Sequence, residues 1–221
     1  MTTHPPDVSA ERVARDLLEI GAVSLSPEKP FRWASGRLAP VYCDNRLTMR
    51  YPRVRGRIAA SFESAIKRVG WPCDVVVGTA TAGIPHAAWL AARVELPMAY
   101  VRSEAKAHGK KRRIEGAPPP GSRAVVIEDL ISTGMSSVAV VEPLREAGIE
   151  VSGIMSIFSY GLEVAEEAFD QAGVDAFSLC TFGTLVDLAE RDSLLPARQI
   201  ASLRRWYSDP EAWSNERLAA D

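Results

Sequence analysis

A regular alternation of strand-like and helix-like segments constrains this chain more than any other feature of its sequence. Apolar runs of strand length recur at residues 74–78, 96–101, 124–127, 151–158 and 174–180. Helical periodicity fills the intervals near residues 84–93, 135–147 and 162–172. Because such alternation builds parallel sheets covered on both faces, we predict an α/β fold with a Rossmann-like, five-stranded parallel sheet flanked by helices. Ligands of these sheets bind beyond the carboxyl ends of the strands.

Outside this alternation the pattern predicts further helices over residues 8–21, 51–69, 183–191 and 197–206. Residues 31–33 and 40–43 are expected to be short antiparallel strands around a turn at Ser35–Gly36. Pro143 should kink or restart the helix in which it falls, because proline lacks the backbone N–H. We expect one compact domain with three parts: an N-terminal segment (1–50), an α/β core (51–195) and a C-terminal helical tail (196–221).

The third strand-like run ends in two adjacent acids, Glu128 and Asp129, and a loop of mostly small and hydroxyl residues follows. Free N–H groups in that loop, together with the N-terminus of the next helix, suit a phosphate. The two acids cannot hold a phosphate because like charges repel. They must face something neutral or positive, such as sugar hydroxyls or a metal cation. The stretch therefore predicts a site for a phosphorylated ribose.

Two more loops follow predicted strands. Residues 78–83 carry only small and hydroxyl side chains, which fits an anion site and an ordinary tight turn about equally. Residues 102–116 contain six Lys or Arg against two Glu and are long for a connection, which is typical of mobile lids. Arg102, Lys106 and His108 are spaced to present cations near the end of the second strand. The cations at 110–113 are expected to be solvated.

Composition and missing motifs exclude several function classes. The net charge of −2 gives no field that would favour nucleic acid or a membrane surface. The sequence shows no signal-peptide pattern and no apolar run near the ~20 residues of a membrane helix. Its three cysteines form no CxxC pair, so we predict a reducing, cytoplasmic location. Neither a GxxxxGK nor a GxGxxG pattern occurs, which disfavours a generic nucleotide-binding protein.

Residues 125–134 resemble the phosphoribosyl pyrophosphate (PRPP) motif of type I phosphoribosyltransferases, with an apolar strand, two acids and a Thr-Gly loop. Four other stretches resemble the orotate phosphoribosyltransferase family. They are similar to its N-terminal hood (residues 31–37 with Pro40, Tyr42, Asp44 and Arg46), its pyrophosphate loop (78–85), its flexible catalytic loop (102–116) and, in one bacterial branch, the end of its fourth strand (157–161). The resemblance covers roughly residues 10–190.

This resemblance implies the type I phosphoribosyltransferase fold with a small N-terminal hood, and the conversion of PRPP and orotate to orotidine 5′-monophosphate and pyrophosphate in pyrimidine (UMP) biosynthesis. It implies catalytic roles for Lys106, Glu128 and Asp129. The implied PRPP-binding residues are Thr79, Ala80, Thr81, Arg102, Lys106, His108, Glu128, Asp129, Leu130, Ile131, Ser132, Thr133, Gly134, Met135 and Ser136. The predicted orotate-binding residues are Tyr42, Arg46, Ser132 and Tyr160. It also implies Mg²⁺ carried by PRPP, with no direct protein ligand, and a homodimer whose lid cations serve the partner's site.

Three positions depart from relatives in this family. Ser103 replaces a lysine of the flexible loop, Ala34 replaces a lysine before the hood's Ser-Gly, and Tyr160 stands where other relatives carry an arginine for the pyrimidine. The partner of the orotate carboxylate is therefore open, with Arg37, Arg46 and the backbone amides of the hood as candidates. Two alternative functions remain: a type I transferase for a purine or uracil, and a non-catalytic PRPP-sensing regulator.

Overall fold

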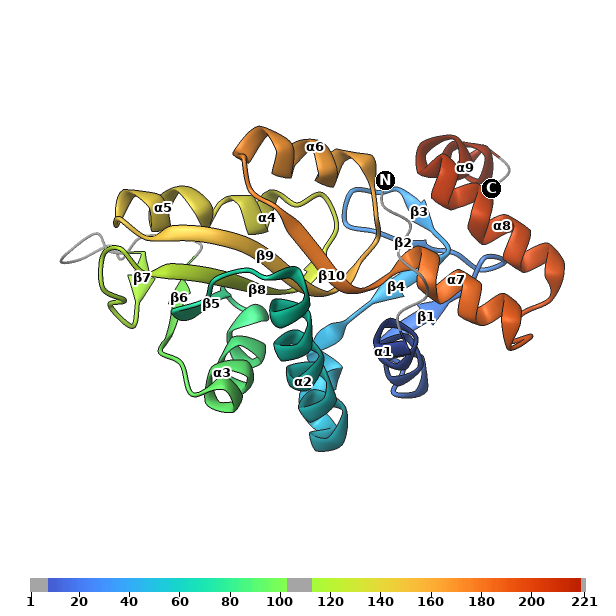
Figure 1. Ribbon diagram of the computed structural model, residues 1–221. Coiled ribbons are helices and arrows are strands. Elements are labelled where there is room, and N and C mark those ends of the chain that lie inside the picture. Colours follow the sequence, from blue (N-terminus) through green and yellow to red (C-terminus); the bar gives the residue numbers. More distant parts are fainter. Residues whose placement is uncertain (1–7, 103–112, 220–221) are drawn as a thin grey trace. The chain divides into compact units, whose positions relative to one another are not determined.

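The computed structural model describes residues 8–102 and 113–219 (Figure 1). The chain gathers into two compact units, one of Thr48–Leu179 and one of Met1–Leu47 with Cys180–Asp221. The N-terminal and C-terminal segments, which were predicted to be separate parts, thus belong to the same unit. Among the described helices, none combines the length and apolar character needed to cross a membrane.

The larger unit is built on a six-stranded sheet with the order β10-β9-β8-β5-β6-β7. The five predicted strands are β5 (Val75–Thr79), β6 (Met98–Val101), β8 (Arg123–Ile131), β9 (Glu150–Ser159) and β10 (Ala176–Thr181). β5 pairs in parallel with β6 and β8, and β8 pairs in parallel with β9. The prediction missed β7 (Ile114–Glu115), which pairs antiparallel to β6. Two residues are too short to show a period in the sequence.

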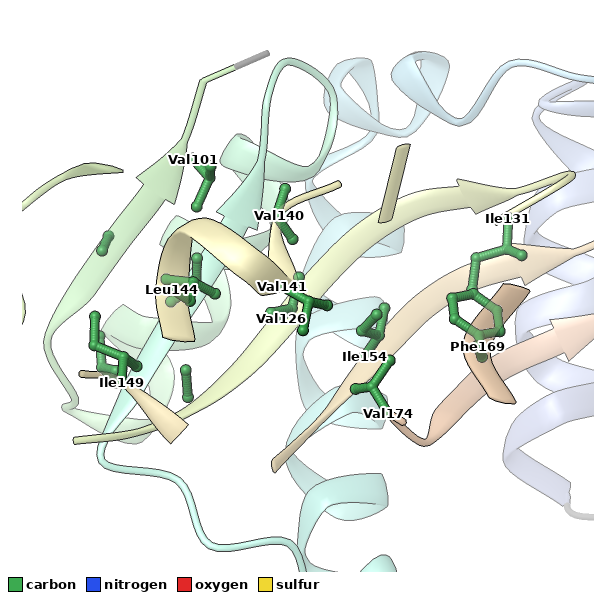
Figure 2. Packing of buried hydrophobic residues seen from close by; sticks show 14 of the residues in the cluster. Val101, Val126, Ile131, Val140, Val141, Leu144, Ile149, Ile154, Phe169 and Val174 are labelled. Atoms are coloured by element: carbon green, nitrogen blue, oxygen red, sulfur yellow. The ribbon is translucent and has the colours of Figure 1, made fainter. Parts of the chain in front are cut away.

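Helices cover both faces of this sheet (Figure 1). α2 (Pro52–Val69) and α3 (Gly83–Val94) lie on one face, and α4 (Met135–Val138), α5 (Val141–Glu146) and α6 (Glu163–Ala172) lie on the other. A cluster of buried hydrophobic side chains packs between the helices α4–α6 and the sheet (Figure 2). It is aliphatic except for Phe169, and Leu144 and Ile154 are among its members. The middle of the central strands is apolar and buried, as at residues 75–77 and 124–127, because both faces of the sheet are covered.

Pro143 confirms the expectation that the helix after β8 would be interrupted. α4 ends at Val138, and α5 begins at Val141 with Pro143 as its third residue. A proline fits there because the first N–H groups of a helix have no acceptor within the helix.

The smaller unit contains α1 (Val8–Glu19), two short antiparallel ladders and the helices α7 (Phe182–Arg191), α8 (Ala197–Ser208) and α9 (Pro210–Leu218). The predicted pairing of residues 31–33 with 40–43 is wrong. β2 (Phe31–Arg32) pairs with β3 (Leu38–Ala39), whereas β4 (Val41–Cys43) pairs with β1 (Val23–Leu25). Pro40 separates β3 from β4, and its missing N–H prevents one continuous ladder. The 3-10 helix η1 (Asn45–Arg50) follows β4.

Candidate active site

β8 carries the two acids of the predicted ribose site inside the strand, and not after its end. The strand continues to Ile131 because β9 pairs with it there, whereas its last partner on β5 is Gly78, opposite Ile127. Glu128 and Asp129 therefore lie where β5 has turned away and β8 keeps only one neighbour. This places both side chains at the carboxyl edge of the sheet, where ligands of such folds bind.

Glu128 is held in one orientation by hydrogen bonds. Glu128 is buried, with only 5% of its surface exposed. The carboxylate accepts from the Ser137 hydroxyl at 3.1 Å, from the Asp129 backbone N–H at 3.0 Å and, more weakly, from the Ser136 hydroxyl at 3.4 Å. A buried carboxylate that accepts several hydrogen bonds is restricted to one rotamer. Sequence reasoning missed the role of Ser137, and the run of serines after Gly134 was its only signal.

Asp129 behaves differently from its neighbour. Burial, and then the hydrogen bond to Glu128 and the charge of Glu128, raise the pKa of Asp129 to about 7. The two adjacent carboxyls therefore share a proton over part of the neutral range. A pair in this state can accept hydrogen bonds from neighbouring hydroxyls, as a vicinal diol requires.

The turn after β8 presents unused backbone donors. It comprises Ser132, Thr133 and Gly134, and α4 then begins at Met135. Gly134 has φ of 75°, a conformation that favours glycine. Within the part of the chain that the structure describes, no residue accepts a hydrogen bond from the backbone N–H groups of 132–137. Because α4 has only four residues, these N–H groups matter more for an anion than the helix dipole that the sequence suggested.

The turn between β5 and α3 lies next to the acids, because β5 and β8 are neighbouring parallel strands. Thr81 is exposed in this turn, and the Ala80–Thr81 peptide bond is cis. Thr79 is 2% exposed, and its hydroxyl donates to the carbonyl oxygen of Ile127 at 3.2 Å. The residue therefore contributes its main chain, and not its hydroxyl, to the surface of the turn.

Of the predicted lid cations, the structure describes Arg102 alone. Its backbone follows β6 directly, and its guanidinium is 3.8 Å from the Glu115 carboxylate on β7. Lys106 and His108, like Ser103, lie outside the described residues.

The predicted orotate-binding residues fall into two groups. Tyr160 donates its backbone N–H to Ile131 at 3.1 Å and so lies beside Ser132. Its ring is buried and packs edge-on against Phe158, with centroids 5.3 Å apart. Tyr42 and Arg46 belong to the other unit, where Tyr42 is 46% exposed and Arg46 pairs with Asp44. Arg37, the other candidate for the orotate carboxylate, pairs with Glu211 in that unit.

The structure thus brings much of the predicted site to one edge of one sheet. The residues gathered there are Thr79, Ala80, Thr81, Arg102, Glu128, Asp129, Leu130, Ile131, Ser132, Thr133, Gly134, Met135, Ser136 and Tyr160. Among the described residues, no group of three or more His, Cys, Asp or Glu side chains could hold a metal ion. The edge combines a pair of carboxylates with two turns, one of which carries free backbone donors, which suits a sugar that carries phosphates.

Known proteins are similar to this chain in sequence and in architecture. A family model described as a phosphoribosyl transferase domain matches residues 52–174. The orotate phosphoribosyltransferase of Bacillus caldolyticus is 51% identical over 203 residues, covering 92% of this chain and 98% of that protein. The orotate phosphoribosyltransferase of Bacillus cytotoxicus is 51% identical over 205 residues, covering 92% and 98%.

Solved structures agree with these relatives. The orotate phosphoribosyltransferase of Aeropyrum pernix matches with a TM-score of 0.71 at 31% identity, over 83% of this chain and 99% of that one. The UMP synthase of Leishmania donovani matches with a TM-score of 0.77 at 26% identity over 90% of this chain, which spans 42% of the length of that protein.

Proposed function

Because this chain belongs to the orotate phosphoribosyltransferase family, we propose that it transfers ribose 5-phosphate from PRPP to orotate, releasing pyrophosphate, at the carboxyl edge of its sheet. One observation carries the proposal. Two carboxylates and a turn of unused N–H groups follow one another on β8, and the turn at 80–82 lies on the adjacent strand. A molecule with a diol between two phosphate groups matches this arrangement, because the carboxylates suit the diol and the two turns suit the phosphate groups.

The 5-phosphate of PRPP is assigned to the N–H groups of residues 132–137. Phosphate accepts well from several converging backbone donors, and none of these has an acceptor among the described residues. The ribose hydroxyls are assigned to Glu128 and Asp129, which follow directly along β8. These contacts are remote from the bond that breaks, so their binding energy serves to position the C1 carbon.

The reaction needs no nucleophile from the protein. The bond from C1 to pyrophosphate breaks and its electron pair leaves with the pyrophosphate, while positive charge develops on the ribose. A ring nitrogen of orotate forms the new bond on the opposite face and loses its N–H proton to the departing pyrophosphate. Glu128 and Asp129 favour the developing charge through their own negative charge. Burial and the neighbouring Glu128 raise the pKa of Asp129, and a cationic ribose would favour release of its proton.

Departing pyrophosphate is assigned to the turn at Thr79, Ala80 and Thr81 and to the cations Arg102, Lys106 and His108. Mg²⁺ enters with PRPP as part of the substrate and neutralises charge on the pyrophosphate. The donor set fits this assignment, because the described site offers two carboxylates, one of them already held by three hydrogen bonds, and no cage of ligands.

Orotate is assigned to Ser132 and Tyr160, which directly follow β8 and β9. Tyr42 and Arg46, the other two predicted orotate-binding residues, belong to the smaller unit, and their role stays a prediction. We further propose a homodimer in which Arg102, Lys106 and His108 serve the partner's site. A cytoplasmic location is consistent with the free state of Cys43, Cys73 and Cys180.

The decisive experiment follows the loss of orotate absorbance on addition of PRPP and Mg²⁺, with a reaction lacking the metal as the control. Parallel reactions with uracil, adenine and hypoxanthine test the alternative that another base is the acceptor. We expect turnover of orotate that depends on both PRPP and Mg²⁺. Binding of PRPP without turnover of any base would instead identify a regulator.

A further inference from the structure

One main-chain oxygen connects the two turns of the site. The carbonyl of Ile127, directly before Glu128, accepts the Thr79 hydroxyl at 3.2 Å. Gly83, the first residue of α3, lies against the same oxygen. A Cβ atom on Gly83 would be 2.4 Å from the Ile127 oxygen and 2.4 Å from the Thr79 Oγ1. Both ends of the turn at 80–82 are therefore fixed on one point of β8.

This contact stands where the ladder between β5 and β8 stops. Gly78 opposite Ile127 is the last pair, and the Ala80 N–H already donates to Val101 on the other side of β5. Beyond the Gly78–Ile127 pair, the Thr79 hydroxyl makes the one side-chain or loop hydrogen bond that joins the turn to β8 among the described residues. A buried hydroxyl bonded to a buried carbonyl is a rigid connection, because neither group has water as an alternative partner.

We propose that Thr79 is a positioning residue, whose buried hydroxyl sets the spacing between the turn at 80–82 and the acid-bearing end of β8. The proposal rests on the proposed function, in which PRPP spans both. The turn at 80–82 holds the pyrophosphate, the end of β8 holds the ribose, and the turn that follows β8 holds the 5-phosphate. A change in their separation misplaces C1 relative to its leaving group, and small misplacements of this kind lower turnover steeply.

The alternative is that the Thr79 hydroxyl binds pyrophosphate directly. The two roles differ in which ligands they affect. A spacing role matters only for a ligand that touches both halves of the site, such as PRPP. A direct contact would matter equally for pyrophosphate alone.

The test compares Thr79→Val, which keeps the shape and removes the hydroxyl, with Thr79→Ser, which keeps the hydroxyl. For each variant we would measure kcat, the KM for PRPP and for orotate, and the Kd of PRPP, Mg-pyrophosphate and ribose 5-phosphate. Thr184→Val is the matched control, because it removes a half-buried hydroxyl bonded to Thr181 at 3.1 Å outside the proposed site. Melting temperatures are recorded for all variants.

We expect Thr79→Val to lower kcat by about 10- to 100-fold and to weaken PRPP, with pyrophosphate and ribose 5-phosphate bound as by the wild type. Thr79→Ser should stay within about 3-fold of the wild type, and Thr184→Val should keep its activity. Gly83→Ala, which pushes α3 off the same oxygen, should reproduce the Thr79→Val pattern.

Three results would overturn the proposal: wild-type kinetics in Thr79→Val, equal impairment in Thr79→Ser, or loss of affinity for pyrophosphate alone. A wild-type protein that binds PRPP but turns over no base contradicts the proposed function, and the comparison of ligand affinities still decides the role of Thr79.

Discussion

Replacing Asp129 by asparagine should make the protein more stable and less active. In the folded protein the pKa of Asp129 is raised from 3.8 to about 7, first by burial and then by Glu128. A shift of about 3 pKa units corresponds to about 4 kcal/mol at ~1.36 kcal/mol per unit, which is an upper bound for two coupled buried carboxyls. An asparagine carries no charge to bury, and its amide can still donate to Glu128.

The sign of this effect depends on pH. A carboxyl whose pKa is raised on folding contributes stability that is fully present below pH 3.8 and is lost as the pH rises through about 7. The wild type therefore loses free energy of unfolding between pH 4 and pH 8 through this group, and Asp129→Asn does not. The variant should gain most above pH 7 and little near pH 4.

Calorimetry at pH 4.5 and pH 8.5 measures the difference directly, since ~1 kcal/mol corresponds to about 2–4 °C in melting temperature for chains of this size. Asp170→Asn, which removes an exposed carboxylate on α6, controls for the change in net charge. The same samples are assayed for turnover, which should fall sharply in Asp129→Asn because the ribose loses a charged partner. An equal melting temperature shift at both pH values would refute the burial argument, and a wild-type rate would refute the ribose role.

Two further predictions test the packing and the surface of the sheet. Gly153→Ala should lower the free energy of unfolding in urea by about 1–3 kcal/mol, because the added Cβ would lie 2.3 Å from the Trp71 ring. The control is Gly56→Ala on α2, where a Cβ meets open space, and this variant should raise the free energy of unfolding by about 0.5–1 kcal/mol. Arg123 lowers the pKa of Asp74 to about 2 through two charged hydrogen bonds at 2.7 and 2.8 Å, so this pair stabilises the fold above pH 3.8 and stops doing so as the pH falls through 2. Asp74→Asn should accordingly lower the melting temperature at pH 7 and leave it unchanged near pH 2, and a shift that is independent of pH would contradict this.

The donor half of the site could be predicted from sequence because its parts are contiguous. An apolar run, two acids and a turn of small residues occupy one stretch, and each has a local physical meaning. The end of β8 could not be predicted in the same way. It continues through Glu128 and Asp129 only because residues 156–159 of β9 pair with it, and such long-range partners leave no local pattern.

The roles of individual hydroxyl residues could not be predicted from the sequence. Thr79 and Thr81 look alike in the sequence of the turn, yet the first turns its hydroxyl inward to Ile127 and the second is exposed. Ser136 and Ser137 are adjacent, and the shorter bond to Glu128 comes from the buried one. Which hydroxyl faces a ligand and which fixes the backbone depends on side-chain direction at the end of a strand, and composition cannot reveal it.

The acceptor half of the site differs from the donor half for a physical reason. Its predicted members come from three separate places in the chain, and the ring of Tyr160 already packs against Phe158. A tyrosine in that position offers a single polar atom, whereas an arginine would offer a charged fork for a carboxylate. Arg37 and Arg46 are the two predicted side-chain partners of the orotate carboxylate, and each would have to exchange its present acidic partner to bind it. If Arg46 binds the carboxylate, it leaves Asp44. Arg46→Gln would then raise the KM for orotate and leave the KM for PRPP unchanged.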